Sequence, residues 1–268
     1  MIVSILGVLQ TAVLVLCALV LHEYAHVFAV NYLGGRVEKV GIFPLGFAAR
    51  FRGLERLFAW ERYVIYGAGS LANVLGAVWA FSVSRISYFG IPWLEDFAFY
   101  SIVLCVFNLI PILPLDGGRI LHQFLSNRIG ILRANRVMLK LGTVISILLI
   151  ILGVVQVVLF NYNITLLCAG VYIKRQNKTM LPTLQMEFFR FLAAKKKPAR
   201  ARLMPVRTVK LSQNTTVKQA LNYLTIDHFT EFECEFENKK ECFLTEEALL
   251  ESVLAVDSEV NLLPCNSL

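Results

Sequence analysis

Long apolar stretches constrain this chain more than any other feature of its sequence. A run of about 20 apolar residues can cross a bilayer as a helix. Candidate spans occupy residues 1–33, 63–91, 97–125, 137–160 and 164–173, the last being short. With 57% hydrophobic and 17% charged residues, the composition differs from that of a soluble domain. We therefore expect a polytopic α-helical membrane protein with about five spans.

Basic residues are unevenly distributed among the loops between these spans. The first loop holds Arg36, Lys39, Arg50, Arg52, Arg56 and Arg62. The third holds Arg119, Arg128, Arg133, Arg136 and Lys140, whereas the second has only Arg85 and the fourth has none. This alternation fits the positive-inside rule. It predicts a multi-pass cell-membrane protein with its N-terminus outside and its C-terminal tail in the cytoplasm, and it gives no reason to expect direct nucleic-acid binding.

Composition divides the chain into three parts: a transmembrane domain at 1–173, a basic juxtamembrane linker at 174–202 and a small α/β domain at 203–268. In the last part, strands are predicted at 208–211, 229–236 and 242–244 from their alternating pattern. Thr215 or Asn214 is expected to cap a helix carrying Val217, Ala220, Leu221 and Leu224, and Thr245 to cap a second. Between the first two spans, residues 34–51 predict a small hairpin or a re-entrant loop, with short extended pieces broken by Gly41, Pro44 and Gly46.

The first span contains the segment HEYAH, residues 22–26. On a helix, residues four apart lie on one face, so His22 and His26 can point at one metal ion. Glu23 lies close enough to reach a water on that metal, which is the arrangement of zinc metalloproteases. Ionisable residues inside a span are costly and are functional by default. The pattern therefore predicts one zinc ion per chain, with Glu23 as the general base.

A catalytic zinc requires a third protein ligand. Asp116 is the best candidate, because Pro111 and Pro114 break the third span and should end its helix at this acid, facing inward. The predicted topology brings it to the cytoplasmic side, where the two histidines lie. His122 is the alternative ligand, or a polar residue of the membrane interface, while His228 in the tail is too remote. Gly117 and Gly118 would let the backbone near Asp116 turn or pack closely.

Two asparagines complete the polar inventory of the spans. Asn73 in the second span and Asn108 in the third could each donate a hydrogen bond to a developing oxyanion or to substrate backbone. They could equally hold helices together, as asparagine often does in membranes. We expect Gly67, Gly69 and Gly76 to permit close packing of the second helix.

Three segments of residues 1–125 together resemble the site-2 proteases, which are intramembrane zinc metalloproteases: HEYAH, Gly69–Asn73 and NLIPILPLDGG. The resemblance implies zinc ligands at His22, His26 and Asp116, Glu23 as base, and a role in holding substrate or the oxyanion for Asn73 and Asn108. The layout is most similar to the stage IV sporulation protein FB group. That likeness implies a pro-sigma factor as substrate, the forespore membrane as location and inhibitory membrane proteins as candidate partners.

The tail is similar to a single cystathionine-β-synthase (CBS) repeat. This likeness implies pairing between chains, hence a homo-oligomer, and makes ATP a candidate ligand of the tail. The function that we predict is hydrolysis of a peptide bond of a membrane-associated protein near the cytoplasmic face. The alternatives are cleavage of an anti-sigma factor or another single-pass protein, or a non-proteolytic metal-binding scaffold with a nucleotide-sensing tail.

Overall fold

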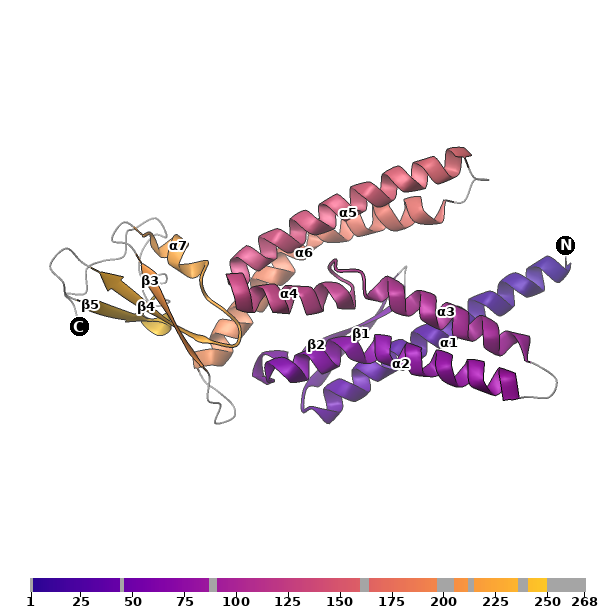
Figure 1. Cartoon of the computed structure of the whole chain (residues 1–268), viewed down its shortest axis with the longest axis horizontal. Coiled ribbons are helices and arrows are strands. Elements are labelled where there is room, and N and C mark those ends of the chain that lie inside the picture. The colour runs from indigo at the N-terminus through magenta and orange to yellow at the C-terminus, as the bar shows by residue number, and fades with distance from the viewer. Residues whose placement is uncertain are drawn as a thin grey trace. The chain divides into compact units, whose positions relative to one another are not determined.

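The computed structural model describes residues 2–43, 46–86, 91–159, 164–196, 205–211, 215–235 and 241–249 (Figure 1). The chain forms two compact units, Met1–Ile120 and Leu121–Leu268. Within the described residues, three helical segments are long and apolar enough to cross a membrane: Leu6–Tyr32, Ala59–Ile86 and Ile131–Leu159. The predicted membrane class is consistent with these helices, while the count of about five spans stays a prediction.

The first unit is a set of three helices that pack on one another: α1 (Ile2–Tyr32), α2 (Ala59–Ile86) and α3 (Pro92–Asn108). Small residues of α2 allow close approach, because Ala77 and Ala80 are buried against Leu94 and Ala98 of α3. Gly76 lies against Leu21 of α1, as predicted, whereas Gly67 has no atom within 4 Å of the place where a Cβ would stand. The prediction that Gly67 serves close packing was therefore wrong: it lies on an open side of α2.

A β-hairpin joins α1 to α2 and confirms one of the two predicted forms of this segment. Strand β1 (Arg36–Phe43) pairs antiparallel with β2 (Gly46–Arg52). Gly41 lies inside β1, opposite Ala48, and does not break it. A short 3-10 helix, η1 (Leu54–Arg56), follows Gly53, whose φ of +88° suits glycine. Ala29, Val30, Leu57 and Ile65 form a buried cluster that joins the end of α1 to the start of α2.

The predicted helix break in the third apolar segment is present, but Asp116 begins a helix where it was expected to end one. Helix α3 ends at Asn108, and α4 (Asp116–Ile129) begins at Asp116. Pro111 and Pro114 lie in the connection, which folds back over the first turn of α4. A Cβ at Gly117 would collide with the carbonyl oxygen of Leu109, and one at Gly118 with the carbonyl group of Ile112. Both glycines are thus required for the predicted close packing at this turn.

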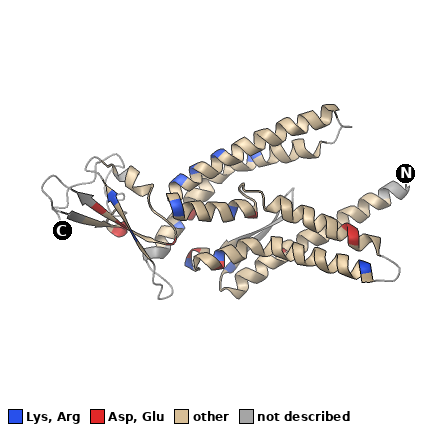
Figure 2. Ribbon diagram, in the orientation of Figure 1, with Lys and Arg blue, Asp and Glu red and all other residues tan. Residues whose placement is uncertain are grey.

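In the second unit, α5 (Ile131–Leu159) and α6 (Thr165–Lys196) run antiparallel side by side. Gly153 lies against Leu167 and Gly142 against Asn177, as an antiparallel pair requires. Figure 2 shows that the Lys and Arg residues of the α5–α6 helix pair lie in the half of the pair that contains the start of α5. Helix α6 continues through residue 173, where a domain limit was predicted. Lys, Arg and Gln favour helix as strongly as Leu does, so the change of composition does not end it.

The described tail residues, 205–249, form the predicted α/β unit, here called the tail module. Its elements are β3 (Val206–Leu211), α7 (Val217–Leu221), β4 (Phe229–Glu235) and β5 (Glu241–Thr245). Strand β4 pairs parallel with β3 and antiparallel with β5. The N-cap of α7 is Thr216, which forms a capping box with Gln219, and not the predicted Thr215 or Asn214. Thr245 accepts the Ala248 N–H at 3.3 Å, the predicted cap.

The tail module packs against the corner between α4 and α5. Leu224, Ile226 and Phe232 share one buried cluster with Ile131 of α5 and with Phe188 and Leu192 of α6. Polar contacts add to this core at residues 127–136 and 222–227. Asn127 Nδ2 donates to Asp227 Oδ2 at 2.7 Å, and the Asp227 N–H donates to Asn127 Oδ1 at 3.3 Å. The Ile131 N–H donates to the carbonyl of Leu224 at 2.9 Å.

Candidate metal centre

Helix α1 supplies the first two side chains of the site. His22 and His26 are one helical turn apart and are 2% and 4% exposed. Tyr24 and Phe28, on the other face of the helix, are 65% and 61% exposed. The two imidazoles therefore point from the buried face of α1 into the protein interior. Two neighbouring buried imidazoles in an apolar helix require partners that satisfy their ring nitrogens.

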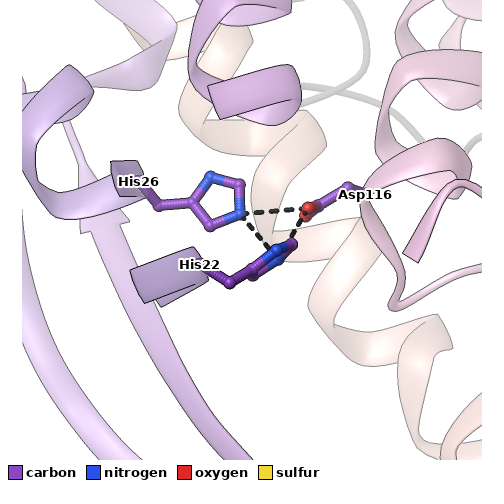
Figure 3. A group of neighbouring side chains, drawn as sticks. All are labelled: His22, His26 and Asp116. Atoms are coloured by element: carbon purple, nitrogen blue, oxygen red, sulfur yellow. Dashed lines mark hydrogen bonds and ion pairs between the residues drawn. The ribbon is translucent and has the colours of Figure 1, made fainter. Parts of the chain in front are cut away.

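Asp116 meets the two imidazoles from the first turn of α4 (Figure 3). Its Oδ2 lies 3.1 Å from Nε2 of His22 and 3.0 Å from Nε2 of His26. The two Nε2 atoms are 3.2 Å apart. The Asp116 residue is 5% exposed, so three ligand-type atoms converge on one point inside the protein. Residues 22 and 116 are distant in sequence, and the fold joins them.

The other nitrogen of each ring is held from α2. Nδ1 of His26 donates to the carbonyl oxygen of Ile65 at 2.7 Å. Nδ1 of His22 lies 3.2 Å from Nδ2 of Asn73. A carbonyl oxygen can only accept, so the hydrogen of a neutral His26 ring is on Nδ1. Its Nε2 then offers a lone pair toward Asp116.

The donor set suits a zinc ion. Neutral imidazole nitrogens and a carboxylate oxygen are zinc ligands, at about 2.0–2.2 Å from the metal in tetrahedral sites. That geometry separates the ligand atoms by about 3.3–3.4 Å, close to the 3.0–3.2 Å observed among these three atoms. Lone pairs at this spacing repel one another unless a cation or a proton lies between them. Three protein ligands also leave the fourth position for water or substrate, as catalytic zinc sites do.

Gly69 of α2 lies directly against the converging nitrogens. A Cβ at this position would collide with Nε2 of His26 and would stand 2.6 Å from Nε2 of His22. The absence of a side chain thus leaves the space that the imidazoles occupy. Sequence analysis assigned Gly69 to helix packing, and its spacing of four from Asn73 was the signal that both lie on the site-facing side of α2.

Two further charged side chains lie within electrostatic range of the site. Glu23 interacts with both imidazoles, with Asp116 and with the guanidinium of Arg119. Arg119 is one turn beyond Asp116 in α4 and interacts with that carboxylate as well. Glu23 is half-buried. Glu23 therefore lies beside the centre, next to His22 on α1.

The remaining predicted site residues have other partners. Asn108 is half-buried and donates from Nδ2 to the carbonyl of Leu104 in its own helix at 3.0 Å. His122 lies in the second unit, and its Nε2 is 2.6 Å from Oδ1 of Asn135. In the described part of the chain, one group of at least three His, Cys, Asp or Glu side chains is close enough to hold a metal, and it consists of His22, His26 and Asp116. Sequence reasoning could not find the Ile65 carbonyl, because any residue type provides one.

Known proteins resemble parts of this chain in sequence. The sequence profile of Peptidase family M50 matches residues 90–152. A zinc metalloprotease of Methanocaldococcus jannaschii is 27% identical over 164 residues, which are 60% of this chain and 46% of that protein. The stage IV sporulation protein FB of Bacillus subtilis is 28% identical over 143 residues, 53% of this chain and 50% of its own length.

The fold has a solved counterpart. The site-2 protease structure from Methanocaldococcus jannaschii matches with a TM-score of 0.52 and 25% identity, over 62% of this chain and 75% of that one. The relatives named here are a zinc metalloprotease and a site-2 protease, a class of membrane metallopeptidase. Residues 90–152 carry a Peptidase family M50 domain, and the chain is similar to site-2 proteases in sequence and fold. It spans about half the length of the curated relatives named above.

Proposed function

We propose that this protein is an intramembrane zinc endopeptidase that hydrolyses a peptide bond of a membrane-associated protein. The observation that carries the proposal is the convergence of Nε2 of His22, Nε2 of His26 and Oδ2 of Asp116 within 3.0–3.2 Å of one another. His22, His26 and Asp116 would hold one zinc ion per chain. The names of two similar proteins, a zinc metalloprotease and a site-2 protease, support the same reaction.

The chain's own residues would divide the chemistry as follows. A zinc ion held here would act as a Lewis acid and lower the pKa of a bound water to about 7. Glu23 would accept the proton of the attacking water and later pass it to the leaving amine. Arg119 lies within electrostatic range of both Glu23 and Asp116 and would place a positive charge beside the two acids. Asn108, at the end of α3, would serve substrate or oxyanion binding as a hydrogen-bond donor.

A helical substrate must unwind before its peptide bond reaches the site, because a helix shields its own amides. The β1–β2 hairpin follows α1 directly and has the extended backbone to which a substrate strand could add. Strand addition would supply main-chain hydrogen bonds to the unwound segment. We therefore propose that the hairpin receives the substrate beside the metal ligands of α1.

The substrate proposed is a pro-sigma factor, with the protein in the forespore membrane. The likeness to the stage IV sporulation protein FB supports this choice. An anti-sigma factor or another single-pass protein is the alternative substrate class. The charge pattern of the loops supports a site near the cytoplasmic face and a cytoplasmic tail module. Pairing of tail modules between chains, an ATP ligand and inhibitory membrane proteins remain predictions from the resemblances stated above.

The test is co-expression of the wild type or the Glu23→Gln variant with a tagged pro-sigma factor, followed by immunoblotting and by measurement of zinc in the purified proteins. We expect cleavage by the wild type alone and one zinc in both proteins. Tyr24→Phe is the matched control, because this neighbour points away from the centre and should cleave normally. Cleavage by Glu23→Gln would remove Glu23 from the mechanism.

The same experiment addresses the non-proteolytic alternative. Zinc bound by the wild type, with no cleavage of pro-sigma, anti-sigma or other single-pass substrates, would favour a metal-binding scaffold. Absence of zinc from the wild type would contradict the proposed function itself.

A further inference from the structure

The side-chain amide of Asn73 is buried beside His22, and only one of its two polar atoms has a partner. Nδ2 lies 3.2 Å from Nδ1 of His22. Oδ1 is enclosed and has no hydrogen-bond donor among the described residues, although Asn73 is 0% exposed. A buried carbonyl oxygen without a donor is unfavourable, and it requires an explanation in a site that is otherwise well satisfied.

A neutral imidazole carries one hydrogen on its nitrogens, so a hydrogen on Nδ1 of His22 leaves Nε2 free to accept, and the reverse also holds. A metal on Nε2 requires the hydrogen to be on Nδ1, where it must meet an acceptor. With Nδ2 of Asn73 as the neighbour, Nδ1 must accept, and the hydrogen is on Nε2. That hydrogen then points toward Oδ2 of Asp116 at 3.1 Å. With the amide in this orientation, Nε2 of His22 carries the hydrogen and has no lone pair for a metal.

We propose that Asn73 is a positioning residue whose amide turns over when the metal binds. This inference rests on the proposed zinc site. Rotation of the amide by about 180° exchanges two groups of nearly equal size, so no helix has to move. Oδ1 then accepts from Nδ1–H of His22, while Nδ2 gives up its contact with Nδ1. One proton leaves Nε2 for water and another binds Nδ1, so the charge of the ring does not change.

His26 provides the internal comparison. Its Nδ1 donates to the carbonyl of Ile65, which cannot donate, so its hydrogen is on Nδ1 with or without a metal. His22 is the ligand whose tautomer depends on a group that can turn. Asn73 therefore acts on the His22 ring at Nδ1, the nitrogen that does not face the metal, and its role is not substrate binding.

The test is zinc affinity of the purified full chain in detergent, measured by competition with a chromophoric chelator. Asn73→Leu keeps the size and removes both hydrogen-bonding atoms, and we expect it to bind zinc about 10–100-fold more weakly, as for loss of other outer-shell partners. Asn73→Asp offers only acceptors and should stay within about tenfold of the wild type. Asn108→Leu is the matched control and should bind zinc as the wild type does, because its amide contacts Leu104 instead of a ligand.

A second measurement needs no substitution at Asn73. The chain has 4 histidines, so ¹⁵N spectra of histidine-labelled protein can be assigned with single His→Gln variants. We expect the hydrogen of His22 on Nε2 in the metal-free protein and on Nδ1 in the zinc-loaded protein, with His26 unchanged. The same His22 tautomer in both forms would overturn the inference.

The outcomes separate this inference from the proposed function. A wild type that binds no zinc would defeat the proposed function. Zinc bound by the wild type, and equally tightly by Asn73→Leu, would defeat only the positioning role of Asn73. If Asn73→Leu aggregates on size exclusion, the ¹⁵N spectra and the Asn73→Asp affinity decide.

Discussion

Nδ1 of His26 donates to the carbonyl oxygen of Ile65 at 2.7 Å, while Nε2 of the same ring lies 3.0 Å from Oδ2 of Asp116. The backbone of α2 thus orients a ligand of α1 toward α4. In a helix this carbonyl also faces the N–H of Gly69, four residues on. Because Gly69 has no side chain, the imidazole of His26 can approach α2 closely enough to use the second lone pair of the carbonyl.

The first prediction concerns that glycine. Gly69→Ala places a methyl group in the space of the two Nε2 atoms, so we expect zinc affinity to fall more than about 100-fold, beyond the loss of an outer-shell partner. Cleavage should stop. Gly67→Ala, two residues away where a Cβ would meet nothing within 4 Å, should bind zinc normally and gain up to about 1 kcal/mol of helix stability. Equal zinc affinity in both variants would contradict the geometry.

The second prediction concerns the carboxylate ligand. Zinc at about 100 times its dissociation constant should stabilise the wild type by about 2.7 kcal/mol, or roughly 5–10 °C in Tm. Asp116→Asn replaces the anionic ligand by a weak neutral one, so this zinc-dependent rise should disappear. Thermal unfolding in detergent, with and without zinc, measures it. Asn108→Leu should keep the full rise, and a rise retained by Asp116→Asn would exclude Asp116 as a ligand.

The third prediction concerns the turn that precedes Asp116. Gly118→Ala would place a Cβ against the carbonyl group of Ile112, so the connection from α3 must move and Asp116 with it. We expect weaker zinc binding together with a loss of about 1–3 kcal/mol of stability from overpacking. Chelator competition and thermal unfolding on one preparation test both effects. A variant with unchanged affinity would show that the turn does not set the position of Asp116.

The fourth prediction concerns the tail module. Asn127 donates to the carboxylate of Asp227 and accepts from the backbone N–H of Asp227, which an alanine would keep. A double-mutant cycle with alanine therefore measures the charged side-chain bond and should give a coupling of about 1–3 kcal/mol. The rate of native-state proteolysis within residues 205–249 measures opening of the module. The ion pair Lys210–Glu233, at 3.1 Å and with the Lys210 side chain 77% exposed, is the control and should couple by less than about 1 kcal/mol. A weaker coupling at Asn127–Asp227 than at the control would contradict the docking contact.

Local sequence rules located the elements that carry the site, but they failed at details that depend on neighbours. Periodicity and apolar length found α1, α2 and α5, and two prolines found the break before Asp116. The cap of α7 is Thr216 because Gln219 can return a hydrogen bond to it, which a list of good capping residues does not decide. Helix α6 runs on past residue 173, because a change from apolar to basic residues alters the surroundings of a helix without ending it.

The sequence by itself determined that His22 and His26 share one face of a lipid-spanning helix, because a spacing of four is a property of any α-helix. It also determined that Asp116 follows a broken span, because proline cannot continue the backbone ladder. Only the tertiary structure decided which atoms meet: the carbonyl of Ile65 behind His26, the amide of Asn73 behind His22 and the bare backbone of Gly69 between them. The sequence could point to Asn73 and Gly69 as residues but not to their partners in α1, and every residue has a carbonyl like that of Ile65, because tertiary packing alone brings these groups together.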